Sequence, residues 1–584
     1  MEEEIEKQFQ EAISVIERPS VSELPLSHAL SSLQELCEQD GHAESCVRYG
    51  ELLMQGNLVD ADQSYAVDLF QRAALTGHSS AHFEVGVAYM LGLGNRTQDI
   101  AKGLVHYAVA AKGDHHLALL SLGFRYHFGI NVPASCEQAV FYLENIAFRV
   151  KDSIIGGQVP LGRIFSDVNQ GWNLEASDSN AVLERQQLLT FLSEDDNPDI
   201  LYQLGMLYLH GLQDMPVDVD LAKKFLLRAA AFPRKAVALY WLGYICEMGL
   251  DGLPPNYELA ADYYNQLVQR QNVMGNVGLG RLLFHRHMPG RSHPEDAFKD
   301  YQEAMIHFNA AAAASNAEAH FYLGMMHLSG LGIPVNAATA SKHFDESVKA
   351  TNSHEIFHPF APSLVMSAYL QLRGLGIAKN CNNALNIYDS IASRWHAGLE
   401  NRSLAVDHYD NGHPQAALYH FERYAEAGYA GAMRTAAMLR LEAGESDRAL
   451  AWYLRAGDLG DADALVKAGD LVSADDQTLA MSLYRKAAGK NVAVAAFNLG
   501  TAHLGLWGNS TVDVFLAKRF LDQAVSYDID AAFPVCLAMW VVFLLYVKQY
   551  LQRPDIIVWV GLSLMLLCLC ILRVSRHLWK HRHQ

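Results

Sequence analysis

A glycine that recurs at a nearly constant spacing constrains the fold of this chain more than any other feature. Successive members are 36 and 37 residues apart in one series, and 38, 37 and 44 in the next: Gly50, Gly86, Gly123, then Gly205, Gly243, Gly280, Gly324. Each lies inside an amphipathic stretch such as AHFEVGVAYM or AHFYLGMMHL. Glycine in mid-helix costs about 1 kcal/mol relative to alanine, so its recurrence indicates a place where two backbones pack closely.

A second pattern marks the helix that follows each such stretch. An alanine precedes an aromatic residue or leucine by four positions, which places both on one helix face. The pairs are Ala66/Phe70, Ala222/Leu226, Ala260/Tyr264, Ala340/Phe344, Ala384/Tyr388, Ala449/Tyr453, Ala480/Tyr484 and Ala517/Leu521. Helix pairs of this kind bury their apolar faces only by stacking. The sequence predicts an all-α fold, an α-solenoid of helix-turn-helix repeats.

The repeats, about eleven in number, fall into three groups at residues 43–147, 199–392 and 404–525. A helical segment is predicted at 1–42. Linkers are predicted at 148–198, which is rich in glycine and poor in repeat signal, and at 393–403.

The C-terminal region is predicted to meet a membrane. Residues 556–572 carry no charge over 17 positions, the short end of what spans a bilayer. Four basic residues follow, and the positive-inside tendency places the tail, 573–584, in the cytosol and the repeats across the membrane.

A second apolar run at 531–547 lies just upstream, within a helix predicted at 528–550. It could be another span, a membrane-interface helix or a partner-docking helix. Pro534 and the polar connector KQYLQRPD favour a helix near the membrane surface.

Composition excludes several classes of function. A formal net charge of −19 argues against nucleic-acid binding, which needs clustered Lys and Arg. The eight cysteines include no C-x-x-C pair, so neither a zinc ribbon nor a thioredoxin-type site is expected. Free buried thiols are the preferred interpretation, with one bridge such as Cys37–Cys46 as the alternative.

One motif suggests catalysis, and its context argues against it. His354, Glu355 and His358 in SHEIFHP match H-E-x-x-H, which binds zinc only on a continuous helix. Pro359 biases His358 away from helical geometry, and the motif falls between a helix ending near 350 and one expected at 362–372. We expect a loop there and no catalytic, metal or cofactor site; an enzyme is not predicted.

Three N-x-S/T sequons, at Asn95, Asn401 and Asn509, are candidate glycosylation sites that should be exposed. Asn95 and Asn509 occupy the same inter-helix loop of their repeats, and Asn401 lies in the break between groups. The first thirty residues show no positively charged and then apolar pattern, so no signal peptide is predicted in this sequence.

The helix–GLG–helix units resemble Sel-one-like repeats. The three-group arrangement over residues 43–580 resembles, more specifically, the ER-membrane adaptor members of that family. The stretches that carry the likeness are LGFRYHFGINVPASCEQAVFYLENIA, GLGIAKNCNNALNIYDSIASR, YDNGHPQAALYHFERYAEAGYAGAMRTAAML and LAKRFLDQAVSYDIDAAFPVCLAMW.

The resemblance implies a non-enzymatic adaptor of a polytopic RING ubiquitin ligase in ER-associated degradation. It implies a lumenal solenoid that receives misfolded glycoproteins and lectin-type receptors, anchored in the ER membrane by one C-terminal span. It also implies that the last repeat and the apolar helix dock on the ligase or the membrane surface, through Phe533, Val535, Leu537, Trp540 and Phe543. The alternative is a tail-anchored cytosolic scaffold, in which the sequons would be unused.

Overall fold

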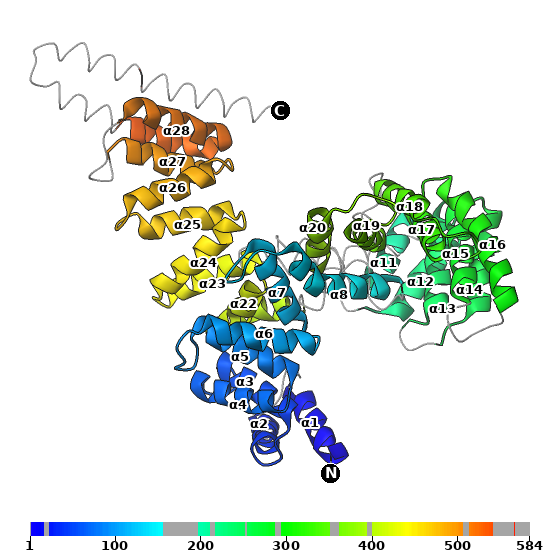
Figure 1. The fold of residues 1–584 in the computed structure, drawn as a ribbon, viewed down its shortest axis with the longest axis horizontal. Helices are drawn as coiled ribbons and strands as arrows, with labels where there is room; N and C mark the ends of the chain where they lie inside the picture. The colour runs from blue at the N-terminus through cyan, green and yellow to red at the C-terminus, as the bar shows by residue number, and fades with distance from the viewer. Residues whose placement is uncertain are drawn as a thin grey trace, which may run out of the picture. The chain divides into compact units, whose positions relative to one another are not determined.

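The computed structural model describes residues 2–16, 23–155, 197–210, 217–250, 254–286, 294–350, 361–393, 400–505, 513–540 and 566. Within these ranges the ordered elements are helices and turns, with no β-strand. Successive helices pack together in pairs, which confirms the predicted all-α solenoid of helix-turn-helix repeats (Figure 1). The chain divides into two compact units, Met1–Gly428 and Tyr429–Gln584.

The first unit begins with a run of helices in which each packs against the next (Figure 1). The helices are α1 (Glu2–Ile16), α2 (Glu23–Glu38), α3 (Ala43–Gln55), α4 (Gln63–Leu75), α5 (Ser79–Leu91), α6 (Ile100–Lys112), α7 (His116–Phe128) and α8 (Cys136–Ile155).

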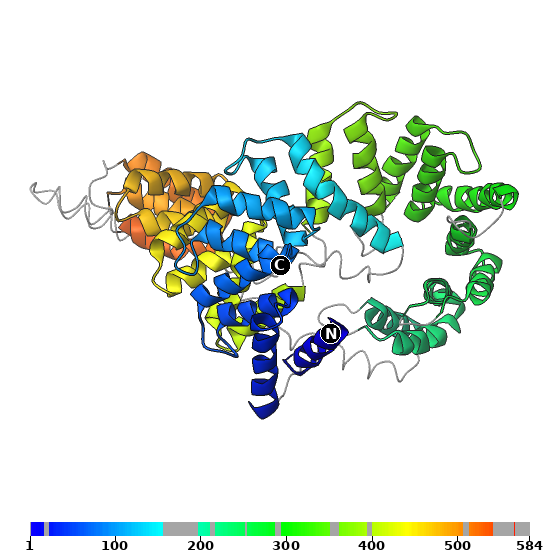
Figure 2. The same cartoon turned by 60° about the horizontal axis from the view of Figure 1, so that its bottom comes forward.

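A second run in the same unit is built around two clusters of buried hydrophobic side chains, and Phe148 and Ile155 of α8 pack against the second cluster. It comprises α11 (Pro198–His210), α12 (Val219–Ala230), η4 (Pro233–Lys235), α13 (Val237–Met248), α14 (Tyr257–Gln269), α15 (Val273–Arg286), α16 (Pro294–Ala312), α17 (Ala317–Ser329), α18 (Ala337–Ala350), α19 (Ala361–Arg373) and α20 (Cys381–Ala392). The run returns to the first, because α19 and α20 pack on α8 (Figure 2). The pair α21 (Glu400–Asp410) and α22 (Pro414–Glu426) follows, and α22 packs on α3 and α7.

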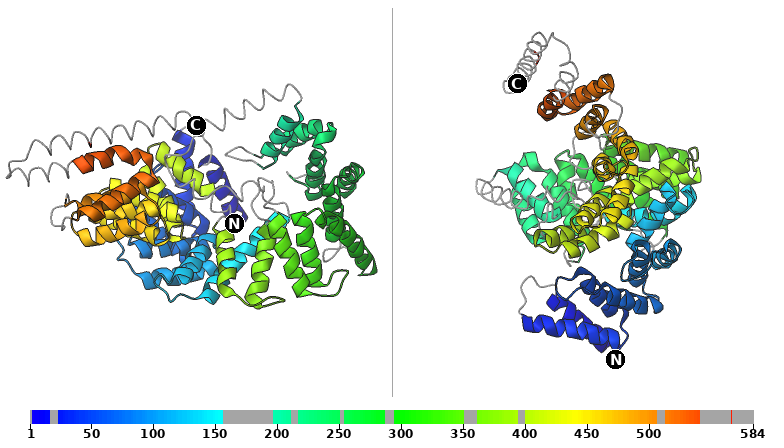
Figure 3. Two further views of the ribbon diagram at one scale, coloured as in Figure 1. Left: turned by 90° about the horizontal axis from the view of Figure 1, so that it is seen from above. Right: turned by 90° about the vertical axis from the view of Figure 1, so that its left-hand side faces the viewer.

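The second unit is a shorter stack of the same kind, drawn from yellow to red-orange in Figure 3. Its elements are α23 (Ala430–Glu442), α24 (Ser446–Asp458), α25 (Ala462–Val472), α26 (Gln477–Ala488), α27 (Ala493–His503), α28 (Val514–Tyr527) and η6 (Ile529–Ala531). A further helical stretch covers residues 532–540.

The recurrent glycine is the contact point of each helix pair. A Cβ on the glycine would lie 2.5–2.8 Å from the ring or leucine of the next helix, closer than real Cβ atoms come. The pairs are Gly50–Phe70, Gly86–Tyr107, Gly123–Leu143, Gly205–Leu226, Gly243–Tyr264, Gly280–Phe308, Gly324–Phe344, Gly469–Tyr484 and Gly500–Leu521. The glycine of the first helix therefore leaves space for the large side chain of the second helix. The two sequence patterns mark the two sides of this helix–helix contact.

The turns between paired helices follow from their end residues. Six first helices end on a left-handed glycine with φ between 62° and 74°, a conformation that side chains disfavour: Gly56, Gly92, Gly129, Gly249, Gly330 and Gly374. Most second helices begin on an aspartate or asparagine whose oxygen accepts a backbone N–H of the first turn: Asp62, Asp99, Asp218, Asn256, Asn380, Asp476 and Asp513.

Two predicted features fall largely beyond the described residues. The H-E-x-x-H stretch lies outside them, between α18 and α19. The span predicted at 556–572 also lies outside them, apart from residue 566. Among the helices that are described, none combines the length and apolar character needed to cross a bilayer.

We expect Gly469→Val to lower the free energy of unfolding of the second unit by about 1–3 kcal/mol, since the added carbons overlap the Tyr484 ring. Gly489→Ala is the matched control, because Gly489 ends α26 with φ −61° and its nearest neighbours stand 3.4 Å from a built Cβ. Urea unfolding followed by circular dichroism measures both. Equal stability of the two variants would contradict the close-packing role of the glycine.

Candidate partner-binding site

The C-terminal end of the second unit presents apolar side chains to its surface. Helix α28 buries Ala517, Leu521 and Ala524 within the unit. Asp528 then ends the helix, and its carboxylate accepts the backbone N–H of Asp530 at 2.9 Å, which starts the η6 turn. Because η6 packs on both α27 and α28, the stretch 532–540 begins at a fixed place on the last repeat.

Residues 532–540 form a helical stretch without a charged side chain, so its outer face is as apolar as its inner face. Ala532, Val535 and Ala538 are buried, whereas Phe533 is 71% and Leu537 51% exposed. Phe533 and Leu537 are four residues apart, so they share one helix face. We call this pair the C-terminal apolar face. Two large apolar side chains exposed side by side make this face a candidate binding surface.

The predicted docking residues therefore differ in position. Phe533 and Leu537 lie at the surface, and Trp540 is half-buried. Val535 is only 8% exposed and supports the helix from below, so it offers no side chain to a partner. Phe543 lies outside the described residues.

The sequons are also placed differently from one another. Asn95 is exposed in the turn between α5 and α6, as is Thr97, and it adopts a left-handed conformation with φ 59°. Asn401, expected in a break between groups, lies in the first turn of α21. Asn509 lies outside the described residues.

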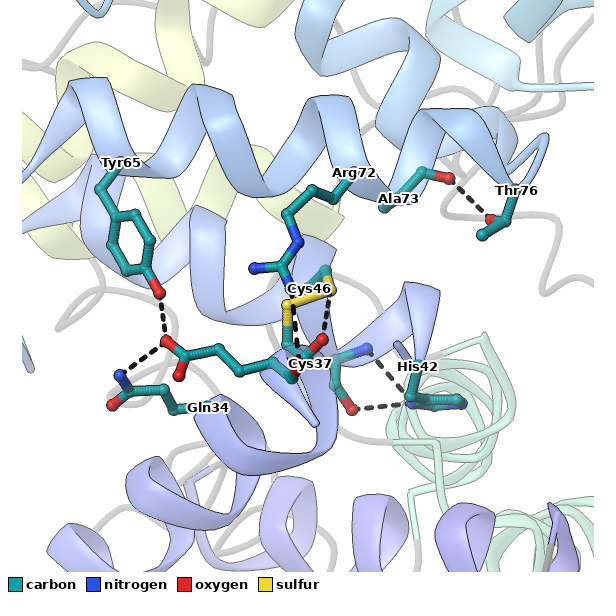
Figure 4. Close-up of a disulfide and its surroundings, with 10 residues drawn as sticks. Gln34, Cys37, His42, Cys46, Tyr65, Arg72, Ala73 and Thr76 are labelled. Carbon is teal, nitrogen blue, oxygen red and sulfur yellow. Dashed lines mark hydrogen bonds between the residues drawn. A yellow bond between two sulfur atoms is a disulfide. The ribbon is translucent and has the colours of Figure 1, made fainter. Parts of the chain in front are cut away.

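Four cysteines form two disulfides, so the preferred prediction of free thiols is wrong for them. Cys37–Cys46 joins α2 to α3 and is the bridge considered as the alternative (Figure 4). Cys136–Cys381 joins α8 to α20 across 245 residues of sequence, a pairing that no local pattern indicated. Cys246 on α13 is a free thiol.

Buried charged side chains join helix α22 to the first run of repeats. We call this group of residues the clasp: Glu51, Glu84, Arg125, Tyr419, Arg423 and Glu426. The Arg423 guanidinium lies 2.8 Å from a carboxylate oxygen of Glu84 on α5 and 3.7 Å from one of Glu51 on α3. The Tyr419 hydroxyl donates to Glu84 at 3.0 Å. One turn further along α22, the Glu426 carboxylate pairs with Arg125 of α7. Because these groups are nearly inaccessible to water, removing one partner would leave the other charge buried and uncompensated.

Burial at the clasp shifts the pKa values of Glu84 and of the neighbouring His115. Burial raises the pKa of Glu84 to about 7, an effect that the nearby Arg423 opposes and the neighbouring Glu51 reinforces. Burial lowers the pKa of His115, beside Arg423, to about 3, so this imidazole is neutral. Neutral His115 caps α7, since its ring nitrogen accepts the backbone N–H of Ala118.

A second buried cluster holds the middle helices together. Arg281 on α15 is 1% exposed and donates to Glu247 of α13 and to the hydroxyls of Tyr240 and Tyr264 at 2.7–2.9 Å. It also pairs with Glu318 of α17 at 2.5 Å. The guanidinium is satisfied on all sides, so the cluster is structural and offers no open position to a ligand.

Sequence reasoning missed both clusters, although a signal was present. Glu84, Arg125, Glu247 and Arg281 are single charges within otherwise apolar helical stretches, each within four residues of a recurrent glycine. A lone charge at such a place must find a buried partner. The identity of the partner depends on helices that meet only in three dimensions.

The described residues contain no group of three or more His, Cys, Asp or Glu arranged to hold a metal ion. Their paired histidines, His82 with His106 and His320 with His343, contact each other through ring nitrogens 3.0 and 3.2 Å apart. The described helices form stacked pairs, and the C-terminal apolar face follows the last of them, α27 and α28.

Comparison with known proteins agrees with this architecture. A family model described as Sel1 repeat matches ten segments that together cover more than half of the chain: residues 43–78, 79–115, 116–147, 198–231, 236–271, 278–316, 317–350, 361–394, 446–461 and 467–492.

Three curated relatives illustrate the range of similarity. Protein sel-1 homolog 2 of Homo sapiens is 27% identical over 190 residues, which cover 32% of the chain and 27% of that protein. The ERAD-associated E3 ubiquitin-protein ligase component HRD3B of Arabidopsis thaliana is 24% identical over 81% of the chain and 72% of its own length. The corresponding component HRD3 of Candida glabrata is 22% identical over 78% of the chain and 62% of its own length. The chain thus spans only about a quarter of the first of these relatives.

The raised pKa of Glu84 predicts that the contribution of this carboxyl to the free energy of unfolding falls as the pH rises. The folded protein keeps the Glu84 proton up to about pH 7, whereas the carboxyl of the unfolded chain loses it near pH 4.5. Its contribution to stability is therefore full below pH 4.5 and is lost towards pH 7, by up to about 1.4 kcal/mol per pH unit. Urea unfolding at pH 5, 6, 7 and 8 measures this slope.

In the same experiment, the difference in unfolding free energy between wild type and Glu84→Gln isolates this contribution, because neutral histidines such as His115 have the opposite effect on the slope of both proteins. That difference should fall from pH 5 to pH 7, whereas the difference between wild type and Glu35→Gln, which changes an exposed carboxyl on α2, should stay constant. A constant difference for Glu84→Gln would show that Glu84 does not titrate in this range.

Proposed function

This chain belongs to the Sel1 repeat family, and from that premise we propose that it is a non-enzymatic adaptor of an ER-membrane ubiquitin ligase complex in ER-associated degradation. The observation that carries the proposal is similarity to a ligase component of that pathway along most of both chains, 81% of this one and 72% of HRD3B. HRD3 of Candida glabrata, also an ERAD-associated ligase component, is similar over a comparable share of the chain.

The cysteines support a lumenal location for the repeats. Disulfides persist in oxidising compartments such as the ER lumen and are rare in the cytosol. Both disulfides lie in the Met1–Gly428 unit, and the exposed Asn95-Arg96-Thr97 sequon lies in the same unit. These features favour a lumenal solenoid, anchored near the C-terminus with a short cytosolic tail, over a tail-anchored cytosolic scaffold.

The C-terminal apolar face is the proposed docking site for the ligase, a polytopic RING-type subunit. Phe533 and Leu537 are held outward by the buried Ala532, Val535 and Ala538, so docking would bury them without refolding the helix. The apolar sequence continues through residue 547, so in sequence this face directly precedes the part of the chain expected at the membrane. The long stacked repeats would leave a large surface for misfolded glycoproteins and lectin-type receptors.

We expect the repeats to carry an N-glycan at Asn95 when the protein is made in eukaryotic cells. Endoglycosidase digestion of membranes should then increase the mobility of the wild type and of Thr97→Ser, while Thr97→Ala should lose one glycan. Protease protection of the repeats in sealed microsomes is measured alongside. An unglycosylated, protease-sensitive repeat region would contradict the proposed location.

Docking is tested by the double variant Phe533→Asp/Leu537→Asp. Loss of two apolar anchors should reduce co-purification of the RING ligase at least tenfold, since buried anchors of this kind contribute about 2 kcal/mol each. Val494→Asp is the matched control, because Val494 is a 56% exposed apolar residue of the same unit. Equal recovery of the ligase with both variants would exclude the C-terminal apolar face as its docking site.

A further inference from the structure

The two disulfides occupy very different environments. Cys37 and Cys46 are 0% and 2% exposed and lie nine residues apart in sequence, so their bond closes a short hairpin. Figure 4 shows this bond between α2 and α3, with Arg72 of α4 beside it. Cleavage would require a reductant to reach sulfur atoms that the folded hairpin covers.

The second bond joins cysteines that are less buried, Cys136 and Cys381. These residues are the first of α8 and the first of α20, and both are half-buried rather than enclosed. Their sequence separation of 245 residues means that the bond closes the whole of the second run of helices onto the end of the first. Among the described residues, no other disulfide joins these two runs of helices.

Non-covalent contacts also join α8 to α19 and α20. Glu144 of α8 accepts a hydrogen bond from Arg373 of α19 at 2.8 Å and a longer one from the Tyr388 hydroxyl of α20 at 3.4 Å. Phe148 meets Tyr369 of α19 edge to face. The Glu144–Arg373 pair is partly exposed, so water screens it and it stabilises the joint only modestly. The disulfide is therefore the strongest single tie between α8 and α20.

We propose that Cys136–Cys381 is a reducible latch and a substrate for a thioredoxin-type dithiol oxidoreductase, whereas Cys37–Cys46 is a permanent structural bond. Thiol–disulfide exchange requires in-line approach of a thiolate to a disulfide sulfur, so its rate depends on access. The half-buried Cys136 and Cys381 at the starts of α8 and α20 offer more access than the buried Cys37 and Cys46 do.

The reaction balances as a two-electron reduction. A thiolate of the oxidoreductase attacks the sulfur of Cys136 or Cys381, forms a mixed disulfide and expels the other sulfur as a thiolate, which takes a proton from water. The second thiol of the oxidoreductase then attacks the mixed disulfide. The oxidoreductase leaves as a disulfide, and both cysteines of the latch become thiols.

Opening the latch should loosen one joint and leave the repeats folded. Helices α19 and α20 keep their own glycine-free packing and their contacts with α18 and α8, but the covalent restraint is gone. We therefore expect faster hydrogen exchange in α8, α19 and α20, with α3–α5 unchanged.

The test uses the purified full-length protein in detergent with thioredoxin, thioredoxin reductase and NADPH under native conditions. Thiols are trapped at intervals with N-ethylmaleimide, and the peptides are measured by mass spectrometry. Cys136 and Cys381 should be labelled at least tenfold faster than Cys37 and Cys46. Equal rates, faster labelling of Cys37 and Cys46, resistance of both bonds, or isolation of Cys136 and Cys381 as thiols would each overturn the proposal.

The double variant Cys136→Ser/Cys381→Ser reproduces the open latch without a reductant. Its exchange should rise in α8, α19 and α20, and Cys37→Ser/Cys46→Ser, the matched control, should instead alter α2 and α3. Unchanged exchange at α19 and α20 would show that the bond restrains nothing there. Neither measurement involves a ligase, so failure here is distinguishable from failure of the adaptor role.

Discussion

The contact between a helix glycine and the large side chain of the next helix sets the geometry on which the other features depend. With no Cβ in the way, the ring of Tyr264 lies against the backbone at Gly243 and also at Gly278 of the following helix. The same ring carries the hydroxyl that Arg281 and Glu247 bind. Close helix approach and the buried polar cluster are thus two aspects of one packing arrangement, and a substitution at the glycine would disturb both.

Stacked repeats contact only their neighbours, so an ordinary solenoid is stabilised locally. The Met1–Gly428 unit departs from that rule at two places. Helix α22 reaches back more than 300 residues to α5 and α7 through Arg423 and Glu426, and α20 reaches back to α8 through Cys381. These closures turn a linear array into a unit whose distant parts stabilise one another. Arginine suits the clasp because its fixed, always charged fork can serve two carboxylates at once, as it does for Glu51 and Glu84.

The repeating part of the fold could be predicted from sequence because its causes are local. Spacing of Gly86 and its equivalents, the alanine–aromatic pairs and the aspartate caps all act within one helix pair, and α18 and α19 end and begin within a residue of the expected positions. The clasp, the Arg281 cluster and Cys136–Cys381 could not, since each joins helices that are distant in sequence. A lone charge such as Glu84 in an apolar helix predicts a buried partner but does not identify it. At the candidate site, Phe533 and Leu537 share a face by spacing alone, but the burial of Val535 depends on how η6 aims the helix.

The buried ion pairs and the half-buried Cys136–Cys381 bond would serve different purposes in the proposed adaptor. A scaffold that must hold a client and a ligase at once needs a surface whose parts do not drift, and buried ion pairs supply this because breaking them exposes an uncompensated charge. Such pairs cannot be opened without unfolding, so any adjustable element must lie elsewhere. Among the described residues of the Met1–Gly428 unit, the half-buried Cys136–Cys381 bond meets that requirement: it joins α8 to α20, while the screened Glu144–Arg373 pair joins α8 to the neighbouring α19. In this proposal the buried ion pairs keep the unit rigid, and the Cys136–Cys381 bond is the element that can be adjusted.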